Sequence, residues 1–93
     1  MSMSSVTDRF EIVNVLGLHA RAATKLVQLA SRYRCEILIG REGQSANAKS
    51  VMGVLLLCGA KGTFVDVTAT GELADEAVRR IGELIASKFG EGE

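Results

Sequence analysis

The sequence is poor in aromatic residues and carries no excess charge of either sign. Its 93 residues include no tryptophan, one tyrosine and three phenylalanines, which are too few for a surface that stacks nucleobases. The 11 basic residues balance 11 acidic ones, so the formal net charge is zero. This balance argues against a protein that binds nucleic acid by neutralising its phosphates.

Proline is absent, and cysteine and histidine are scarce. The two cysteines, Cys35 and Cys58, lie far apart, and the chain has one histidine. This set disfavours zinc, so we expect two buried thiols, no metal and no cofactor. No apolar run is long enough to cross a membrane, and the opening residues Met1-Ser2-Met3-Ser4-Ser5 lack the regions of a secretion signal. We therefore expect a cytoplasmic protein that does not insert into membranes.

The composition is that of one small globular domain. Apolar residues make up 47% of the chain and charged residues 24%, which suits a packed core rather than disorder. The length suits a single domain over residues 1–93, and we expect its ordered core to cover about residues 6–89. The last four residues, Gly90-Glu91-Gly92-Glu93, are expected to fray.

Alternating apolar and polar residues predict four strands. The first covers about residues 6–13 and the second about residues 35–39. The glycine-bounded turn at 40–43 then suggests a hairpin into a short, polar strand at about 44–46. The fourth strand follows Gly62, where the apolar and polar residues alternate again.

Helical spacing of apolar residues predicts three helices. The first runs from about residue 20 to 33 and the last from about residue 74 to 88. Between them, Ser50 is suited to cap a short helix that runs through Cys58 and stops at Gly59. The order β-α-β-β-α-β-α contains a hairpin, which precludes an all-parallel sheet. We therefore predict an α+β fold, with a four-stranded antiparallel sheet and three helices on one face.

The single histidine lies where a strand passes into an amphipathic helix. Free backbone N–H groups and the positive end of the helix dipole make this position an anion site. Gly17 permits a tight turn and Leu18 can anchor it in the core, which would leave His19 near solvent. A nucleophilic nitrogen in an anion site points to phosphoryl chemistry on the histidine itself. The alternative is a histidine that only caps the helix or lies on the surface.

Arg21 stands in the first turn of the same helix, two residues after His19. Its guanidinium can fold back toward the same anion, although an arginine there can also be a solvated helix residue. The N–H groups and Arg21 disfavour imidazolium, so the neutral ring can attack phosphorus without a separate base. The same groups would stabilise a phosphohistidine by charge-assisted hydrogen bonds. Thr24, one turn further on, can offer a hydroxyl or be ordinary helix surface.

Two motifs resemble those of one protein family. The run Gly17-Leu18-His19-Ala20-Arg21-Ala22-Ala23-Thr24 is similar to the active-site signature of HPr, the histidine-containing phosphocarrier of the phosphoenolpyruvate-dependent phosphotransferase system. The run Ala48-Lys49-Ser50-Val51-Met52-Gly53-Val54-Leu55 resembles the regulatory-serine signature of that family, and Ala60-Lys61-Gly62 also fits. The likeness covers nearly the whole chain, from about Val6 to Phe89.

The resemblance implies an open-faced β-sandwich and a carrier with no independent enzymatic turnover. It implies that His19 accepts a phosphoryl group from enzyme I on Nδ1 and donates it to an enzyme II A domain for sugar uptake. It also implies that Ser50 is a site of regulatory phosphorylation, by an HPr kinase/phosphorylase where one is present. We expect a monomer that binds no nucleic acid.

Two positions depart from the family pattern. Ala22 stands where proline is usual. Alanine keeps the helix geometry and adds an N–H donor, so we expect slightly looser preorganisation and retained function. Cys58 stands where glycine is common at the end of the middle helix, and we expect Gly59 to stop that helix instead.

The middle helix is apolar nearly all round, so a fold with helices on one face must leave part of it exposed. We assign Val54 and Leu57 to the core. We expect Met52 and Leu55, with Val51, to form a small exposed patch for partner docking, where the adaptability of methionine suits several partners. The resemblance supports this assignment, because the partner surface of the family lies on equivalent residues beside the active histidine.

Ser50 has two compatible interpretations. As an N-cap it stabilises the helix by about 1 kcal/mol and needs no regulatory role. A hydroxyl at a helix start is also a place where a phosphate is electrostatically favourable. Lys49, the preceding residue, fits either interpretation.

Three alternative functions stay open. A regulatory paralogue in the nitrogen-related branch would use the same chemistry, although the intact motif Lys49-Ser50-Val51-Met52-Gly53 favours the sugar branch. An α+β binding module with an inert His19 would gain no phosphate from enzyme I and phosphoenolpyruvate. A small hydrolase would need a nucleophile with a matched base, and the sequence has no such motif.

Overall fold

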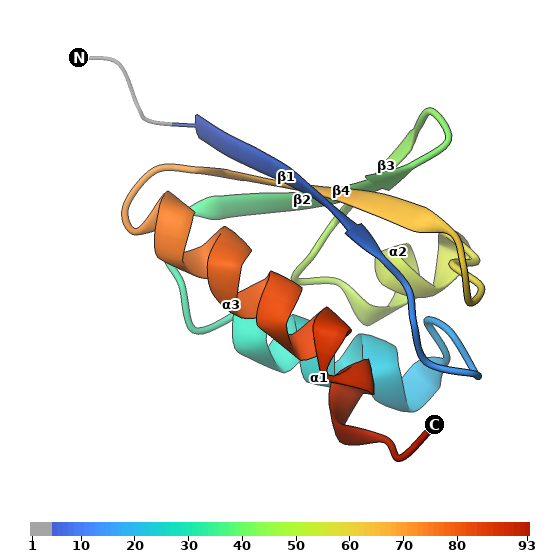
Figure 1. Cartoon of the computed structure of the whole chain (residues 1–93). Helices are drawn as coiled ribbons and strands as arrows, with labels where there is room; N and C mark the ends of the chain where they lie inside the picture. Colours follow the sequence, from blue (N-terminus) through green and yellow to red (C-terminus); the bar gives the residue numbers. More distant parts are fainter. Residues whose placement is uncertain (1–4) are drawn as a thin grey trace.

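The helices and strands follow one another in the predicted order, as Figure 1 shows. The structure, a computed structural model, describes residues 5–93. Residues 1–4 lie outside the described residues. They belong to the predicted domain 1–93 and to the stretch in which we expect no secretion signal. The elements are β1 (Ser5–Glu11), α1 (Ala20–Ala30), β2 (Glu36–Arg41), β3 (Gln44–Asn47), α2 (Val51–Leu56), β4 (Phe64–Thr70), α3 (Ala74–Ala86) and the 3-10 turn η1 (Lys88–Gly90).

One four-stranded sheet, in the order β1-β4-β2-β3, forms the upper layer in Figure 1. Every neighbouring pair is antiparallel. Phe10 of β1 lies opposite Val65 of β4, and Ile37 of β2 lies opposite Ala69 of β4. All three helices lie below the sheet and cover one of its faces (Figure 1). The predicted α+β fold, an open-faced sandwich of an antiparallel sheet and three helices, is confirmed.

The core lies between the sheet and the helices. Successive side chains of a strand point to opposite faces, so Val65, Val67 and Ala69 of β4 are fully buried. Burial of each valine side chain stabilises the folded state by about 1.5–3 kcal/mol. The helices contribute Ala22, Ala23, Leu26 and Ala30 from α1, Val54 from α2, and Ala77, Val78, Ile81 and Ile85 from α3.

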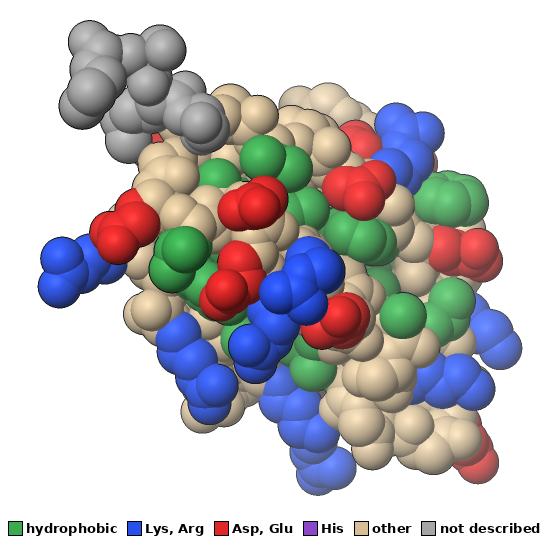
Figure 2. Space-filling view, turned by 60° about the vertical axis from the view of Figure 1, so that its left-hand side comes forward, with side chains coloured by type: hydrophobic (Ala, Val, Ile, Leu, Met, Phe, Trp, Pro, Cys, Tyr) green, Lys and Arg blue, Asp and Glu red, His purple; other side chains and the backbone are tan. Residues whose placement is uncertain are grey.

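Charges of both signs are mixed over the surface seen in Figure 2. Lysine and arginine side chains lie there among aspartate and glutamate side chains, with hydrophobic groups between them (Figure 2). Arg9 and Asp66 of neighbouring strands approach to 3.0 Å, and Arg79 and Glu83 of α3 to 3.4 Å. The face in Figure 2 therefore offers no extended field of one sign.

Several predicted boundaries are wrong by a few residues. β1 ends at Glu11 rather than Val13, and the bounds of β2 and β3 differ from the predicted ones by one or two residues. α1 ends at Ala30 rather than Tyr33, because Tyr33 leaves the helix and is buried in the core. Its hydroxyl donates a hydrogen bond to the carboxylate of Glu76 at 2.9 Å.

The middle helix also ends earlier than predicted. α2 stops at Leu56, and Cys58 adopts a left-handed conformation with φ of 53° that turns the chain. The prediction that the helix runs through Cys58 and is stopped by Gly59 is therefore wrong. At this turn the Cys58 side chain is exposed, whereas Cys35 is buried. The expectation of two buried thiols is correct only for Cys35.

The segment after α3 does not fray as predicted. α3 ends at Ala86 rather than Lys88, and left-handed φ values at Lys88 and Phe89 turn the chain so that Phe89 is fully buried. The Lys25 ammonium donates to the carbonyl of Phe89 at 2.6 Å. The N–H of Val15 donates to the carbonyl of Glu93 at 3.1 Å. A buried ring and two hydrogen bonds thus hold the segment beside the start of α1.

α3 crosses β1 so closely that glycine is required at position 82. A Cβ atom on Gly82 would lie 2.2 Å from the ring of Phe10. Glycine inside a helix costs roughly 0.5–1 kcal/mol relative to alanine. Close packing of the helix on the sheet therefore outweighs helix propensity at this position.

We expect Gly82→Ala to lower the free energy of unfolding by about 1–3 kcal/mol, because overpacking against Phe10 exceeds the gain in helix propensity. Chemical denaturation measures the change. In a Phe10→Ala background the same substitution should raise the free energy of unfolding, since the ring is gone and only the propensity gain is left. Equal destabilisation in both backgrounds would contradict this account.

Candidate functional site

The loop between β1 and α1 is fixed against the loop between α2 and β4. The N–H of Leu18 donates to the Gly59 carbonyl at 2.8 Å, and the Leu18 side chain is buried. Gly17 has φ of +66°, and a Cβ atom there would lie 2.4 Å from the Gly59 oxygen. A Cβ atom on Gly59 would lie 2.7 Å from the Leu18 side chain. Both glycines are needed for this approach, and the predicted roles of Gly17 and Leu18 are confirmed.

His19 follows this contact as the N-cap residue of α1, with extended backbone (φ −75°, ψ 176°). The N–H of Ala23 donates to the His19 carbonyl at 2.8 Å and opens the hydrogen-bond ladder of the helix. The N–H groups of residues 20–22 precede that ladder, and Ala22 supplies one of them. Together with the positive end of the helix dipole, these donors favour an anion beside the imidazole.

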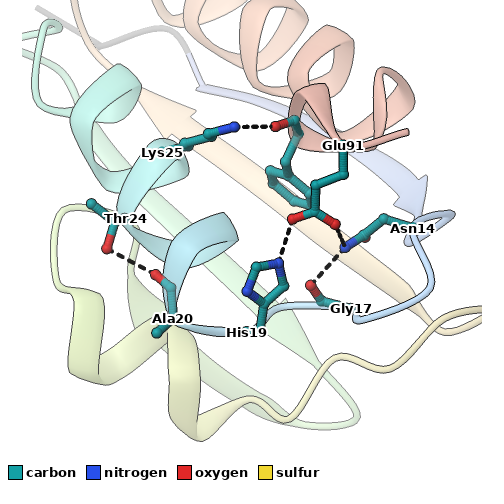
Figure 3. A network of polar contacts seen from close by, with 8 residues as sticks. Asn14, Gly17, His19, Ala20, Thr24, Lys25 and Glu91 are labelled. Atoms are coloured by element: carbon teal, nitrogen blue, oxygen red, sulfur yellow. Dashed lines mark hydrogen bonds and ion pairs between the residues drawn. The ribbon is translucent and has the colours of Figure 1, made fainter. Parts of the chain in front are cut away.

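A carboxylate that the sequence did not reveal lies against the imidazole. Oε2 of Glu91 makes a short contact with Nε2 of His19 (Figure 3). Nδ2 of Asn14 donates to Oε1 of Glu91 at 3.0 Å and to the Gly17 carbonyl at 2.9 Å. The His19 side chain is 26% exposed and that of Glu91 17%. We expected His19 to be open to solvent, but it is half-buried because Glu91 covers one edge of the ring.

The surroundings of Glu91 favour its ionised form. The hydrogen bond from His19 is the main cause that lowers the pKa of Glu91, and the Asn14 amide lowers this pKa further. Partial burial acts in the opposite direction and raises the pKa, but the net shift is downward. Near neutral pH the group on Nε2 is a carboxylate, which can only accept hydrogen bonds.

Arg21 and Thr24 extend from the first turns of α1. Arg21 is exposed and lines the same shallow hollow as His19 and Glu91. Its positive charge therefore adds to that of the helix N-terminus around the hollow. The Thr24 hydroxyl donates to the carbonyl of Ala20 at 2.8 Å, one turn back, which assigns it to the helix surface (Figure 3).

Ser50 caps α2 as predicted. Its Oγ accepts a hydrogen bond from the N–H of Gly53 at 3.1 Å, and its backbone is extended (φ −120°, ψ 114°). This bond satisfies one of the free donors at the helix start. α2 packs beside α1, so the capped end belongs to the same layer as the helix that carries His19 (Figure 1).

The exposed face of α2 differs from the predicted one. Met52 is 68% exposed, as expected, and Val54 and Leu57 are buried. Leu55 is only half-exposed and packs against the core, so its assignment to the exposed side is wrong. Val51 is likewise half-buried against the core. Leu56, which the sequence analysis did not select, is 68% exposed because the helix turns that position away from the sheet.

The groups around His19 suit reversible binding of an anion at a ring nitrogen. They are one imidazole, one carboxylate, one guanidinium and a set of backbone N–H donors. Across residues 5–93, no three histidine, cysteine, aspartate or glutamate side chains are placed to hold a metal ion. Over the same residues, no helix has the length and apolar character needed to cross a membrane.

Two residues of the site, Asn14 and Glu91, escaped sequence reasoning. Asn14 had a weak sequence signal, because it is a single amide between Val13 and Val15. The structure shows that it is fully buried. Glu91 had none, since it stands among glycines in a segment whose composition indicates fraying. Its partner His19 lies 72 residues away along the chain.

Comparison with known proteins agrees with this fold. Residues 6–87 match the family model described as PTS HPr component phosphorylation site. Phosphocarrier protein HPr of Pseudomonas aeruginosa is 47% identical over 83 residues, which are 88% of this chain and 92% of that protein. Phosphocarrier protein NPr of Shewanella violacea is 42% identical over 89 residues, which are 96% and 98% of the two chains.

The crystal structure of HPr-C-His from Thermoanaerobacter tengcongensis matches the present one with a TM-score of 0.87. It is 41% identical in sequence, and the match covers 98% of this chain and 100% of that chain. The family model, the relatives and the shared fold together show that this chain belongs to the HPr family of the phosphotransferase system.

Proposed function

We propose that this protein carries phosphoryl groups on His19, from phospho-enzyme I to enzyme II A domains that serve sugar uptake. It acts in the cytoplasm as a monomer and turns over no substrate of its own. The observation that carries the proposal is the position of His19 at the N-terminus of α1, with helix N–H donors and Arg21 around the same hollow. Membership in the HPr family supports this role.

Each group at the site has a task in the proposed transfer. A ring nitrogen of His19 attacks the phosphorus of the donor, and negative charge then collects beside the start of α1. The N–H groups of residues 20–22 and the dipole of α1 stabilise that charge without moving, because they are fixed by the helix. Arg21 adds a planar guanidinium that can bind two phosphate oxygens.

The proposed partner surface is the outward face of α2 beside the site. Of the predicted docking residues Val51, Met52 and Leu55, Met52 is the exposed one, and the other two lie half-buried at its border. The equally exposed Leu56 extends the surface. An exposed apolar group of this kind on a small protein is typical of a protein contact. Methionine adapts to partners of different shape, as successive binding to enzyme I and to enzyme II A domains requires.

A regulatory nitrogen-branch carrier is a second candidate. The NPr of Shewanella violacea, 42% identical over nearly the whole chain, supports it. The intact run Lys49-Ser50-Val51-Met52-Gly53 favours the sugar branch. Incubation with each purified enzyme I paralogue and phosphoenolpyruvate separates the candidates, because the paralogue that phosphorylates the chain faster identifies its branch.

His19→Ala should abolish phosphoryl acceptance and leave the fold intact, because His19 is outside the core. Intact mass after incubation with enzyme I and phosphoenolpyruvate measures acceptance, with thermal unfolding as the control for folding. The wild-type product should be labile to acid and stable to alkali, as a phosphoramidate is. Absence of a phosphate on the wild type would indicate a binding module with an inert histidine, and full phosphorylation of His19→Ala would exclude this residue as the acceptor.

Met52→Asp should raise the KM of enzyme I for this carrier about tenfold or more with little change in stability, because a charge on an exposed contact must be desolvated in the complex. Leu73→Asp is the matched control, since Leu73 is exposed at the start of α3 and lies near Arg32, which follows the end of α1 opposite His19. Steady-state kinetics and thermal unfolding measure both effects. An unchanged KM for Met52→Asp would remove α2 from the docking surface.

Phosphorylation of Ser50, by an HPr kinase/phosphorylase or mimicked by Ser50→Asp, should weaken binding to enzyme I without unfolding the domain. A phosphate at the start of α2 is stabilised by the free N–H groups there, but it places nearly two negative charges at the rim of an apolar contact. Binding titrations against enzyme I measure the loss, and Ser5→Asp, on a distant strand, controls for charge alone. Unchanged affinity would leave Ser50 as an N-cap only.

A further inference from the structure

The carboxylate of Glu91 is held on one ring nitrogen of His19 by a chain of specific contacts. Phe89 anchors the segment in the core, and the Lys25 ammonium binds its carbonyl. Asn14, which is fully buried, then donates to Oε1 of Glu91 and leaves Oε2 directed at the imidazole. Figure 3 shows this arrangement around the ring. The contact is thus built by the fold rather than made by a free surface side chain.

This contact distinguishes the two nitrogens of the ring. An ionised carboxylate has no proton to donate, so the contact places a proton on Nε2. The neutral ring then carries its lone pair on Nδ1, which points away from Glu91 and toward the first turn of α1 (Figure 3). The nucleophilic nitrogen is therefore the one that faces the anion-binding N–H groups.

The geometry points to Glu91 as a positioning residue for phosphoryl transfer through His19. Its carboxylate holds the imidazole in the Nε2–H tautomer, aims Nδ1 at the start of α1, and balances the positive charge that the ring gains when Nδ1 is phosphorylated. Asn14 acts through Glu91 by orienting the carboxylate. This inference rests on the proposed function, because it assumes that His19 is the phosphoryl acceptor.

Phosphoryl transfer to Nδ1 requires no proton to leave Nε2. The Nδ1 lone pair forms the bond to phosphorus, and the bond between phosphorus and its donor group breaks, with the electron pair going to the donor. The ring is then phosphorylated on Nδ1, keeps its proton on Nε2 and carries a positive charge next to the Glu91 carboxylate. When the phosphoryl group passes to the next protein, the pair returns to Nδ1 and the neutral tautomer is restored.

Glu91→Ala, Glu91→Gln and the matched control Glu93→Ala test the inference. Glu93 lies in the same segment and lines the same hollow, but it is attached through its backbone carbonyl. Nitrogen-15 spectra of His19 in the unphosphorylated proteins report which ring nitrogen carries the proton, at a pH where the same signals show a neutral ring. Single-turnover transfer from phospho-enzyme I gives the maximal rate constant and the half-saturating concentration separately.

In wild type and Glu93→Ala the proton should reside on Nε2. Glu91→Ala should shift population to the Nδ1–H tautomer and lower the maximal transfer rate about tenfold, a typical effect of losing one charge-assisted hydrogen bond, while the half-saturating concentration stays unchanged. In Glu91→Gln the amide oxygen still accepts a hydrogen bond. Its tautomer population and maximal transfer rate should therefore lie between those of wild type and Glu91→Ala.

Two outcomes overturn the inference, and they differ from failure of the proposed function. Wild-type tautomer populations in both Glu91 variants would show that the carboxylate does not set the proton. Wild-type transfer rates in Glu91→Ala, with phosphorylation of His19 intact, would show that Glu91 has no part in the step. Failure of the wild-type protein to accept a phosphoryl group would instead overturn the proposed function, whatever the tautomer.

Discussion

The close approach of two loop backbones, at Gly17 and Gly59, is the constraint on which the site depends. The approach lets the N–H of Leu18 donate a hydrogen bond to the Gly59 carbonyl. This bond fixes the position of the chain just before α1 begins. His19 is consequently the cap of the helix, and its ring lies next to the first free N–H groups. A Cβ atom on Gly17 would meet the Gly59 oxygen, and one on Gly59 would meet the Leu18 side chain, so either substitution would disturb the approach that positions the imidazole.

The fold could be predicted from the sequence because each strand and helix has a recognisable pattern of residues within its own segment. Alternation in β4 and helical spacing in α3 identify the residues that face the core, and Ser50 identifies the start of α2 by the chemistry of its hydroxyl. Chain turns were less predictable. Cys58 adopts a left-handed conformation that glycine adopts more easily, and the only hint of it is the family's preference for glycine at this position.

Only those residues of the candidate site that are close together in the sequence could be predicted. His19 and Arg21 belong to one contiguous run, so their shared position at a helix start follows from the sequence. Glu91 contacts His19 because the chain turns at Phe89 and the buried Asn14 amide orients the carboxylate. Residues so far apart in the sequence leave no periodic pattern that predicts their contact. The exposed face of α2 was ambiguous for another reason: with apolar residues on every side, spacing cannot tell Leu55 from Leu56.

The buried ring of Phe89 ties the electrostatics of the histidine to the local stability of the last turn of the chain. Withdrawing this segment from the site exposes a fully buried aromatic side chain, which costs roughly 1.5–3 kcal/mol. The core therefore holds a negative charge beside the imidazole, and amide hydrogen exchange at Val15, whose N–H is bonded to Glu93, reports how often this segment opens.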